Sequence, residues 1–268
     1  MSGAVRQVGQ RIAAIALNTF RDAIRHRVLY GVAVVVLGFN LFGIVLGEMS
    51  LNEEGRVARD VGLAGVSLFG AFTAIYLGVS LLYNEIQRKT IYTILTKPIA
   101  RWEFVLGKYV GMCITLTLLV ALFAVTMVAV LWLRDMPFGV AMTKAIVLAY
   151  MEVLIVAAVA IFFSSFSTPF LSGVFTFAIY FLGRVTPEMR ALAARDDFLG
   201  GAMAVVLRII PDLHLYAVSG SVVEGKHVSI HGDFVSWGYV ASAYGFGILY
   251  AAALLLLAIA IFSRRNFA

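Results

Sequence analysis

The apolar runs of this sequence constrain its fold more than any other feature, because they are long enough to cross a lipid bilayer. A helix needs roughly 20 apolar residues to cross about 30 Å of hydrocarbon. Hydrophobic residues make up 62% of the 268-residue chain and charged residues 13%, which is more apolar surface than a water-soluble protein buries. The pattern predicts an all-α, polytopic membrane protein with six transmembrane helices, at residues 29–46, 61–83, 105–133, 145–166, 170–185 and 239–262.

A short polar segment separates the fourth run from the fifth. One helix through both runs would be too long for a single bilayer, and a proline disfavours helical geometry in the residue before it. We therefore expect a turn between these spans, formed by Ser164, Ser165, Ser167, Thr168 and Pro169. The chain shows no internal repeat of the kind that builds inverted-repeat transporters.

The Lys and Arg residues indicate how the spans are oriented. The segment before the first span and the loop between the second and third spans each hold five of them, and the C-terminus holds Arg264 and Arg265. Because short cytoplasmic loops are enriched in Lys and Arg, both termini and residues 84–104 are predicted to be cytoplasmic, in a prokaryotic plasma (inner) membrane. The formal net charge of +6 therefore indicates membrane orientation rather than nucleic-acid binding.

The N-terminal segment, residues 1–27, has the pattern of an amphipathic helix lying on the membrane surface. Its helical stripe consists of Val8, Ile12, Ile15, Thr19 and Ala23, and the rest of the wheel carries Arg11, Asn18, Arg21 and Arg25. Such a helix is attracted to anionic lipid, and the alternative is a plain basic tail. The segment has no apolar stretch before Val28, so no cleavable signal peptide is expected.

Residues 84–104 form the longest predicted cytoplasmic connection and contain a short helix. Its apolar side holds Ile91, Ile94 and Leu95, and Pro98 ends it. A helix with one apolar and one charged side suits a docking surface for a soluble partner. The alternative is a loop that rests on lipid headgroups.

Residues 186–237 form the longest segment predicted outside the membrane. Residues 198–210 are apolar but too interrupted to span, so we expect a helix lying at the outer surface or dipping partly into it. Residues 222–230, around Glu224-Gly225-Lys226, predict a small β-hairpin.

The sequence contains no catalytic constellation, so the chain is not expected to be an enzyme. It has no Walker A motif for nucleotide phosphates and no His-Glu-x-x-His or Cys-x-x-Cys pattern. His227 and His231 are four residues apart, but a closed metal site needs about four ligands, so we expect neither a metal nor another cofactor. Cys113 lies within an apolar run and is expected to be a small buried side chain.

Glu152 is the sole acid predicted at membrane depth, about a third of the way into the fourth span. Charge at this depth is costly and normally faces the interior of a helix bundle. Two interpretations are open, a polar group on a relay or translocation route and a hydrogen bond between helices. Because no chain of further acids accompanies Glu152, the structural interpretation is favoured.

Small residues predict close helix packing in two places. Gly70, Ala74 and Gly78 line one face of the second span, and Gly107 and Gly111 open the third. Small residues four positions apart let helix backbones approach closely. The pattern suits packing within one chain as well as a dimer interface.

Residues 83–108, around the loop between the second and third spans, hold a further pattern: Glu85, the basic pair Arg88 and Lys89, Thr90, then Leu95-x-x-Pro98-x-x-Arg101 and Gly107-Lys108. This pattern resembles the corresponding loop of ABC-2 type permeases, the membrane subunits of ABC exporters. Three further segments are similar to that family: Phe163-Ser-Ser-Phe-Ser-Thr-Pro169 to its turn, Asn18-Thr-Phe-Arg-Asp22 to its N-terminal interfacial helix, and Ser263-Arg-Arg-Asn-Phe267 to its ending.

The resemblance implies a partner and a set of contact residues. Two permease chains would pair, as a homodimer or a heterodimer, and each would dock one ABC ATPase subunit. The family's coupling positions match Glu85, Arg88, Lys89, Thr90 and Tyr92, and its second contact matches Ser164, Ser165 and Ser167. The segment at 198–223 matches the region that caps the outer side in the family.

Two functions from different classes follow from these observations. The first is a transport subunit that exports a substrate with energy from a separate ATPase. The second is a membrane scaffold that transmits ATPase-driven motion to an extracytoplasmic partner without moving a solute. An intramembrane enzyme is disfavoured, because the turn serines have no base nearby in the sequence.

Overall fold

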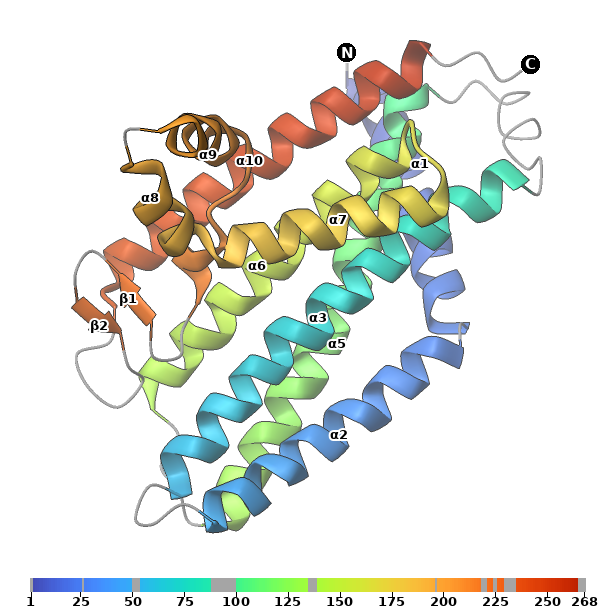
Figure 1. The fold of residues 1–268 in the computed structure, drawn as a ribbon. Coiled ribbons are helices and arrows are strands. Elements are labelled where there is room, and N and C mark those ends of the chain that lie inside the picture. The colour runs from blue at the N-terminus through green and yellow to red at the C-terminus, as the bar shows by residue number, and fades with distance from the viewer. Residues whose placement is uncertain are drawn as a thin grey trace.

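The computed structural model describes residues 2–25, 27–49, 54–87, 100–134, 139–195, 197–217, 221–223, 226–228 and 235–264. These residues form an almost entirely helical bundle (Figure 1). The elements are α1 (Ser2–Arg25), α2 (Arg27–Glu48), α3 (Glu54–Gln87), α5 (Arg101–Leu133), α6 (Val140–Ser164), α7 (Pro169–Arg184), α8 (Thr186–Ala193), α9 (Phe198–Ile209), the 3-10 turn η1 (Leu213–Tyr216), β1 (Ser221–Val223), β2 (Lys226–Val228) and α10 (Trp237–Arg264).

The helices agree with the predicted spans, with one exception. Among the described residues, α2, α3, α5, α6 and α10 are each long and apolar enough to cross a membrane. The fifth predicted span is only the 16-residue α7, which begins at Pro169 as expected. It is followed by α8 after a bend of 71°, so the fifth predicted span is not one straight helix. The bent pair α7–α8 is either a broken span or a re-entrant segment.

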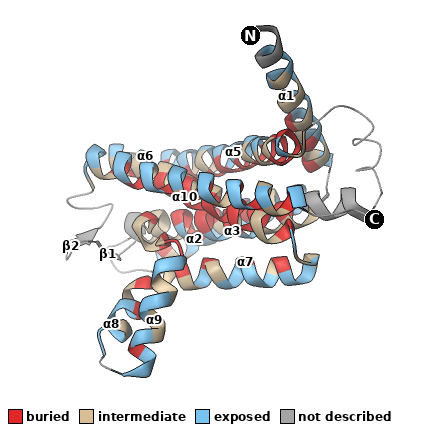
Figure 2. Ribbon diagram, turned by 90° about the horizontal axis from the view of Figure 1, so that it is seen from above, coloured by how far each residue is buried: buried red, intermediate tan, exposed pale blue. Residues whose placement is uncertain are grey.

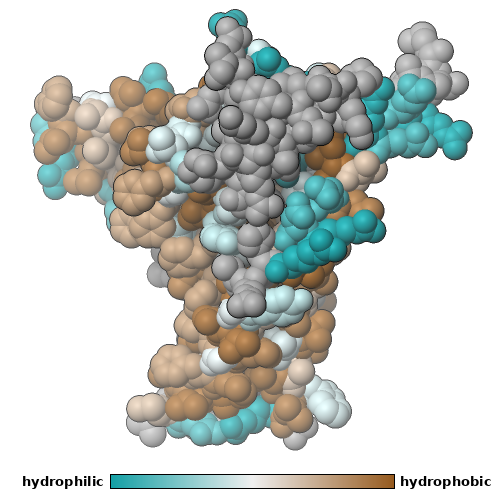
Figure 3. All heavy atoms as spheres, turned by 90° about the vertical axis from the view of Figure 1, so that its right-hand side faces the viewer, coloured by the Kyte–Doolittle hydropathy of each residue, from teal (hydrophilic) through white to brown (hydrophobic). Residues whose placement is uncertain are grey.

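Helix α6 lies at the centre of the bundle. It packs against α3, α5, α7 and α10, and it is apolar on every side, as expected of a buried helix. Figure 2 shows the buried residues gathered where these helices meet. The peripheral helices instead expose large apolar side chains, and hydrophobic residues cover much of the bundle surface in Figure 3, with hydrophilic ones at its lower tip.

Glycines bring two pairs of helices into close contact. A Cβ on Gly78 would lie 2.4 Å from Ala160 Cβ, and one on Gly70 would lie 2.6 Å from Val153, so α3 packs directly on α6. A Cβ on Gly111 would likewise lie 2.5 Å from the backbone oxygen of Ala16 in α1. Both small-residue faces are therefore used within the chain.

Helix α1 is present, and part of its apolar stripe is covered by protein, since Val8, Ile12 and Ile15 are half-buried. Thr19 and Ala23 are fully buried, and Gly107 and Gly111 of α5 lie against this face of α1. Packing on α5 therefore accounts for the stripe that predicted a helix on lipid. The predicted position of α1 in the membrane interface stays a prediction.

Several chain segments meet at one end of the bundle. The Arg101 side chain, at the start of α5, donates to Phe262 O at 3.1 Å and to Ser263 O at 2.8 Å, at the end of α10. Arg11 of α1 pairs with Glu103 at 3.7 Å. Both marked termini lie at this end in Figure 1, together with the end of α3. The prediction that both termini and residues 84–104 lie on one side of the membrane stays a prediction, since residues 88–99 are outside the described residues.

The segment between α7 and α10 holds the predicted small hairpin. Strands β1 and β2 pair antiparallel, with Val222 opposite His227. The predicted helix at 198–210 is α9, whose first turn is capped by the Asp197 side chain accepting from Gly200 N at 2.8 Å. Helix α8 was not expected from the sequence.

Candidate functional site

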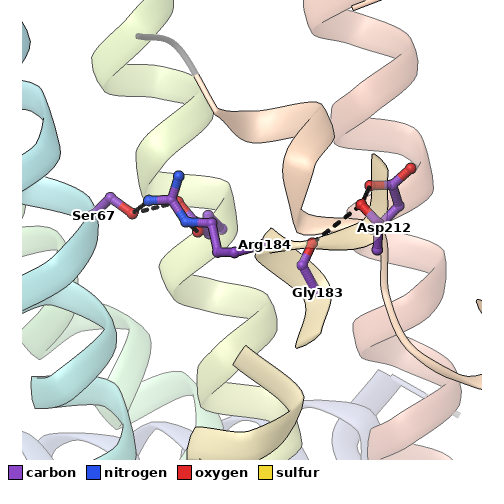
Figure 4. A network of polar contacts seen from close by, with 6 residues as sticks. Ser67, Gly183, Arg184 and Asp212 are labelled. Atoms are coloured by element: carbon purple, nitrogen blue, oxygen red, sulfur yellow. Dashed lines mark hydrogen bonds and ion pairs between the residues drawn. The ribbon is translucent and has the colours of Figure 1, made fainter. Parts of the chain in front are cut away.

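A charged cluster lies in the interior of the bundle, between α3, α6 and the end of α7 (Figure 4). Glu152 of α6 is fully buried, and its Oε1 lies 2.8 Å from Arg184 Nε. Ser67 of α3 donates its hydroxyl to Glu152 Oε2 at 2.6 Å, and Arg184 also donates to the Ser67 hydroxyl. The carboxylate is thus held by an ion pair and a hydrogen bond from two different helices.

The depth of this cluster follows from the lengths of two helices. Glu152 is twelve residues from each end of α6, so it sits at the midpoint of the span and not a third of the way along it. Helix α7 rises about 24 Å over its 16 residues, which is less than the roughly 30 Å of a hydrocarbon layer. Its last residue, Arg184, therefore lies inside the bundle, within the predicted span at residues 170–185.

Glu152 makes the interhelical contacts that the structural interpretation predicted, and a role on a relay or translocation route stays a prediction. The acid has a cationic partner, which the linear pattern did not reveal. Removing one member of a buried ion pair strands the other charge and costs about 3–5 kcal/mol. The contact joins three helices, so it is a structural link at the point where α7 stops. The sequence signal for Arg184 was a lone cation at the end of an unusually short apolar run.

A second polar cluster lies directly after the bend that follows α7. Thr186 donates its hydroxyl to Asp212 Oδ1 at 2.6 Å, and Arg190 pairs with the other oxygen of the same carboxylate. Figure 4 shows Gly183 and Asp212 beside Arg184, so the two clusters are neighbours along the chain and in space. Polar contacts therefore fix the chain on both sides of the α7–α8 bend.

Tyrosine hydroxyls attach the segment after α9 to the bundle. Tyr250 donates to Ile209 O at 2.9 Å, and Tyr239 donates to Leu215 O at 2.7 Å. Tyr216 in turn donates to Ala243 O of α10 at 2.7 Å. Since Tyr250 lies thirteen residues into the 28-residue α10, the end of α9 is held beside the middle of the bundle. The sequence predicts a helix lying at the outer surface or dipping partly into it, and the position of α9 relative to a membrane stays a prediction.

The predicted partner-contact residues are only partly visible. Glu85 lies in the last turn of α3, but its side chain is outside the described residues, as are Arg88, Lys89, Thr90 and Tyr92. The structure does not test their predicted role.

The turn between α6 and α7 is described, and it buries two of its serines. Ser164 is 6% exposed and Ser165 is 1% exposed, and Ser165 donates its hydroxyl to Phe162 O at 2.7 Å. A serine whose hydroxyl donates to a carbonyl of its own helix does not project from the surface of the turn. The turn therefore presents Phe166, with Ser167 half-buried beside it.

An apolar cavity of about 410 Å³ lies between α3 and the start of α7, close to this turn. One hydroxyl and one phenol are among its lining residues, so it suits a hydrocarbon group better than a charged one. The lining consists of Phe72, Ile75, Tyr76, Val79, Ser80, Pro169 and Gly173.

The part of the chain that the structure describes contains no candidate metal site. No group of three or more His, Cys, Asp or Glu side chains there is close enough to hold an ion. His231 and the side chain of His227 lie outside that part. Cys113 is a free thiol, partly exposed on α5.

Comparison with known protein families identifies the family of the chain. The family model described as ABC-2 family transporter protein matches residues 13–267, which is nearly the whole chain. A search of curated proteins finds no match to this sequence.

Proposed function

Since the chain belongs to the ABC-2 family of transporter membrane proteins, we propose that it is the permease subunit of an exporter driven by a separate ATPase. In this proposal two permease chains pair, as a homodimer or a heterodimer, and each docks one ATPase subunit. ATP hydrolysis takes place in the partner, in keeping with a sequence that has no Walker A motif. The chain itself is an integral membrane component.

The observation that carries the proposal is the gathering of chain segments at one end of the bundle. The end of α3, the start of α5, the α6–α7 turn and the end of α10 all belong to this end. Of the predicted docking residues, Glu85 lies in the last turn of α3, and Arg88, Lys89, Thr90 and Tyr92 follow in the sequence before α5. A soluble ATPase that binds this end has contact with several spans at once. Force applied there has a direct route into the bundle.

Contacts in the first turns of α5 support such a route. Arg101 holds the last carbonyls of α10, Phe104 stacks on Phe262 with ring centroids 6.0 Å apart, and Glu103 pairs with Arg11 of α1. In the proposed mechanism, movement of the docking loop carries α1, α5 and α10 together. The docking loop is also joined to α3, which precedes it in the chain and packs closely on α6.

A docking test is charge reversal of Arg88 and Lys89 to Glu. An ion pair desolvated at an interface loses roughly 2–5 kcal/mol when one partner is removed, and about 3 kcal/mol lowers affinity on the order of 100-fold. We expect the double variant to be expressed and to form its permease dimer, but to lose its ATPase. Affinity purification of the tagged permease from native membranes in mild detergent, followed by mass spectrometry and an ATPase assay, measures this.

Arg264 and Arg265 offer a control of equal charge. Like Arg88 and Lys89, they are predicted from the sequence to be cytoplasmic. Reversal of these two residues to Glu should leave the ATPase bound. If the Arg88/Lys89 variant retains its ATPase as well as the parent does, residues 84–98 are not the docking element.

The alternative is a membrane scaffold that passes ATPase-driven motion to an extracytoplasmic partner. The long segment between α7 and α10 is the feature that favours it. Reconstitution of the permease–ATPase complex into sealed vesicles separates the two. A scaffold hydrolyses ATP without moving any of the cell's extractable lipids or solutes across the membrane, whereas a permease moves at least one.

A further inference from the structure

The two ends of the α8–α9 hairpin meet beside the bundle. A Cβ on Gly183, just before α8, would lie 2.8 Å from Pro211 O and 2.8 Å from Leu213 Cγ, just after α9. Residues 183–186 and 209–212 therefore run in contact, and together they form what we call the hairpin hinge. Because both chain crossings are at one place, the hairpin can turn about this hinge without breaking a span.

Little packing fixes the hairpin beyond its hinge. Helix α8 packs on α9 and on η1, and α9 packs mainly on α8. Phe198, at the tip, is 89% exposed. Figure 2 shows the hairpin projecting sideways from the bundle. Apolar contacts with the long helices thus do little to set its direction, and the polar contacts at the hinge carry that role.

One carboxylate makes those contacts on the hairpin side. Asp212 accepts from Thr186 at 2.6 Å through one oxygen and pairs with Arg190 through the other. Thr186 and Arg190 are four residues apart, so they share one face of α8. Asp212 also lies at the N-terminal turn of α8, where a negative charge is favoured by the helix dipole. The carboxylate thus holds the first turn of α8 along the returning chain.

The contacts on the two sides of the bend differ in accessibility. Arg184 is anchored to Glu152, which is fully buried, and to Ser67. The Arg190 side chain is 61% exposed and that of Asp212 is 15% exposed. The first contact is enclosed by three helices, whereas the second faces outward on one side.

We propose that the Arg184–Glu152 pair is a fixed pivot and that the Arg190–Asp212 pair is a releasable latch that sets the angle of the α8–α9 hairpin. Release of the latch turns the hairpin about residues 183–186 and 209–212 while α7 stays in place. A role for this movement in substrate passage rests on the proposed function, but the latch itself does not.

Distance measurement between two spin labels tests the latch in the purified permease, without ATPase or nucleotide. The labels are placed at Phe198 on the hairpin tip and at Val140 at the start of α6, both highly exposed, in a Cys113→Ala background. Dilution with unlabelled protein suppresses distances between subunits. We expect one narrow distance distribution in the parent. Arg190→Gln and Asp212→Asn should each broaden or shift it, the latter while keeping an acceptor for Thr186.

A charge exchange and a matched control complete the test. The double variant Arg190→Asp with Asp212→Arg should restore a narrow distribution. Arg134→Gln, which breaks the exposed Arg134–Glu48 pair elsewhere on the bundle, should leave it unchanged. The latch is refuted if Arg190→Gln gives the parent distribution, and an exchange variant that stays broad argues against a charge-based latch. Either result stands whether or not the protein binds an ATPase.

Discussion

The carboxylate of Glu152 is held at the midpoint of a central helix by groups from two others. Arg184 supplies the opposite charge and Ser67 supplies a hydrogen bond. A charge at this depth is tolerated because it is paired and enclosed. The pair therefore fixes where α7 ends, and its loss is felt in the packing of α3, α6 and α7 together.

A double-mutant cycle at this pair should be strongly non-additive. Arg184→Gln strands the fully buried carboxylate and is expected to be the most destabilising, by about 3–5 kcal/mol. Glu152→Gln strands a guanidinium that is 31% exposed and should cost less. The double variant, with no unpaired charge, should be more stable than Arg184→Gln. Thermal unfolding in detergent, followed by intrinsic tryptophan fluorescence, measures the order.

The exposed pair Arg134–Glu48 serves as the reference for this cycle. Its side chains are 41% and 53% exposed, so Arg134→Gln should change the unfolding free energy by no more than about 1 kcal/mol. Equal effects of Arg184→Gln and Arg134→Gln would contradict a buried pair.

Single residues were the least predictable part of the molecule. The sequence identified Glu152 as an intramembrane acid, but it did not reveal Arg184 as its partner, because the linear pattern does not show which distant residues meet in the bundle. The serines of the α6–α7 turn were matched to a contact surface, yet Ser164 and Ser165 turn inward. Which way a small hydroxyl points depends on the local carbonyls, and that is decided only when the helices have packed.

At the scale of helices, two pairs are joined by direct backbone approach. Gly70 and Gly78 bring α3 onto α6, and Gly107 and Gly111 bring α5 onto α1. The loop predicted to dock the ATPase connects one pair to the other. Each pair is tightly packed, so relative movement is expected between the pairs rather than within them.

Substitution of Gly78 by Ala should loosen the α3–α6 pair. The added Cβ would lie 2.4 Å from Ala160 Cβ, so the helices must separate. Overpacking of this kind costs about 1–3 kcal/mol. Gly38→Ala on α2 is the control, since its Cβ would meet nothing within 4 Å. Apparent melting temperature in detergent should fall for the first variant and stay level for the second, and a fall in both would point to detergent sensitivity of any helix glycine.

Helices were predicted well because their apolar runs are set by the thickness of the bilayer. The predicted limits of the first four spans and of α10 lie within seven residues of the observed ones, and the largest difference is at the start of α3. Helix α8 was missed because its eight residues carry little apolar character and follow a bend that no local motif marks. The stripe of α1 was correctly seen as apolar, but periodicity does not distinguish lipid from a neighbouring helix.

At the scale of the whole molecule, the ends of the chain share one side of the bundle with the predicted docking loop. Contacts from Arg101 to the end of α10, and from Arg11 to Glu103, hold this side together. The charge distribution predicts that this side is cytoplasmic. The opposite side carries the connections from α2 to α3 and from α5 to α6.

Cysteine labelling in intact cells checks this orientation. In a Cys113→Ala background, cysteine at Asn52 or Ser229 should react with a membrane-impermeant maleimide added outside. Cysteine at Gln87, at the end of α3, should react only after the cells are permeabilised. Reaction at Gln87 in sealed cells would reverse the orientation.

The tyrosine contacts between α10 and the segment after α9 also set an order of biosynthesis. Tyr239 and Tyr250 belong to α10, and they hold Ile209 and Leu215, which the ribosome makes earlier. Helices α2 to α7 are synthesised first and can already join Glu152 to Arg184. The α8–α9 hairpin then has the contacts of its hinge, but it gains its contacts with α10 only after that helix is made. A nascent chain that stops before Trp237 is therefore expected to hold the hairpin less firmly than the complete bundle does.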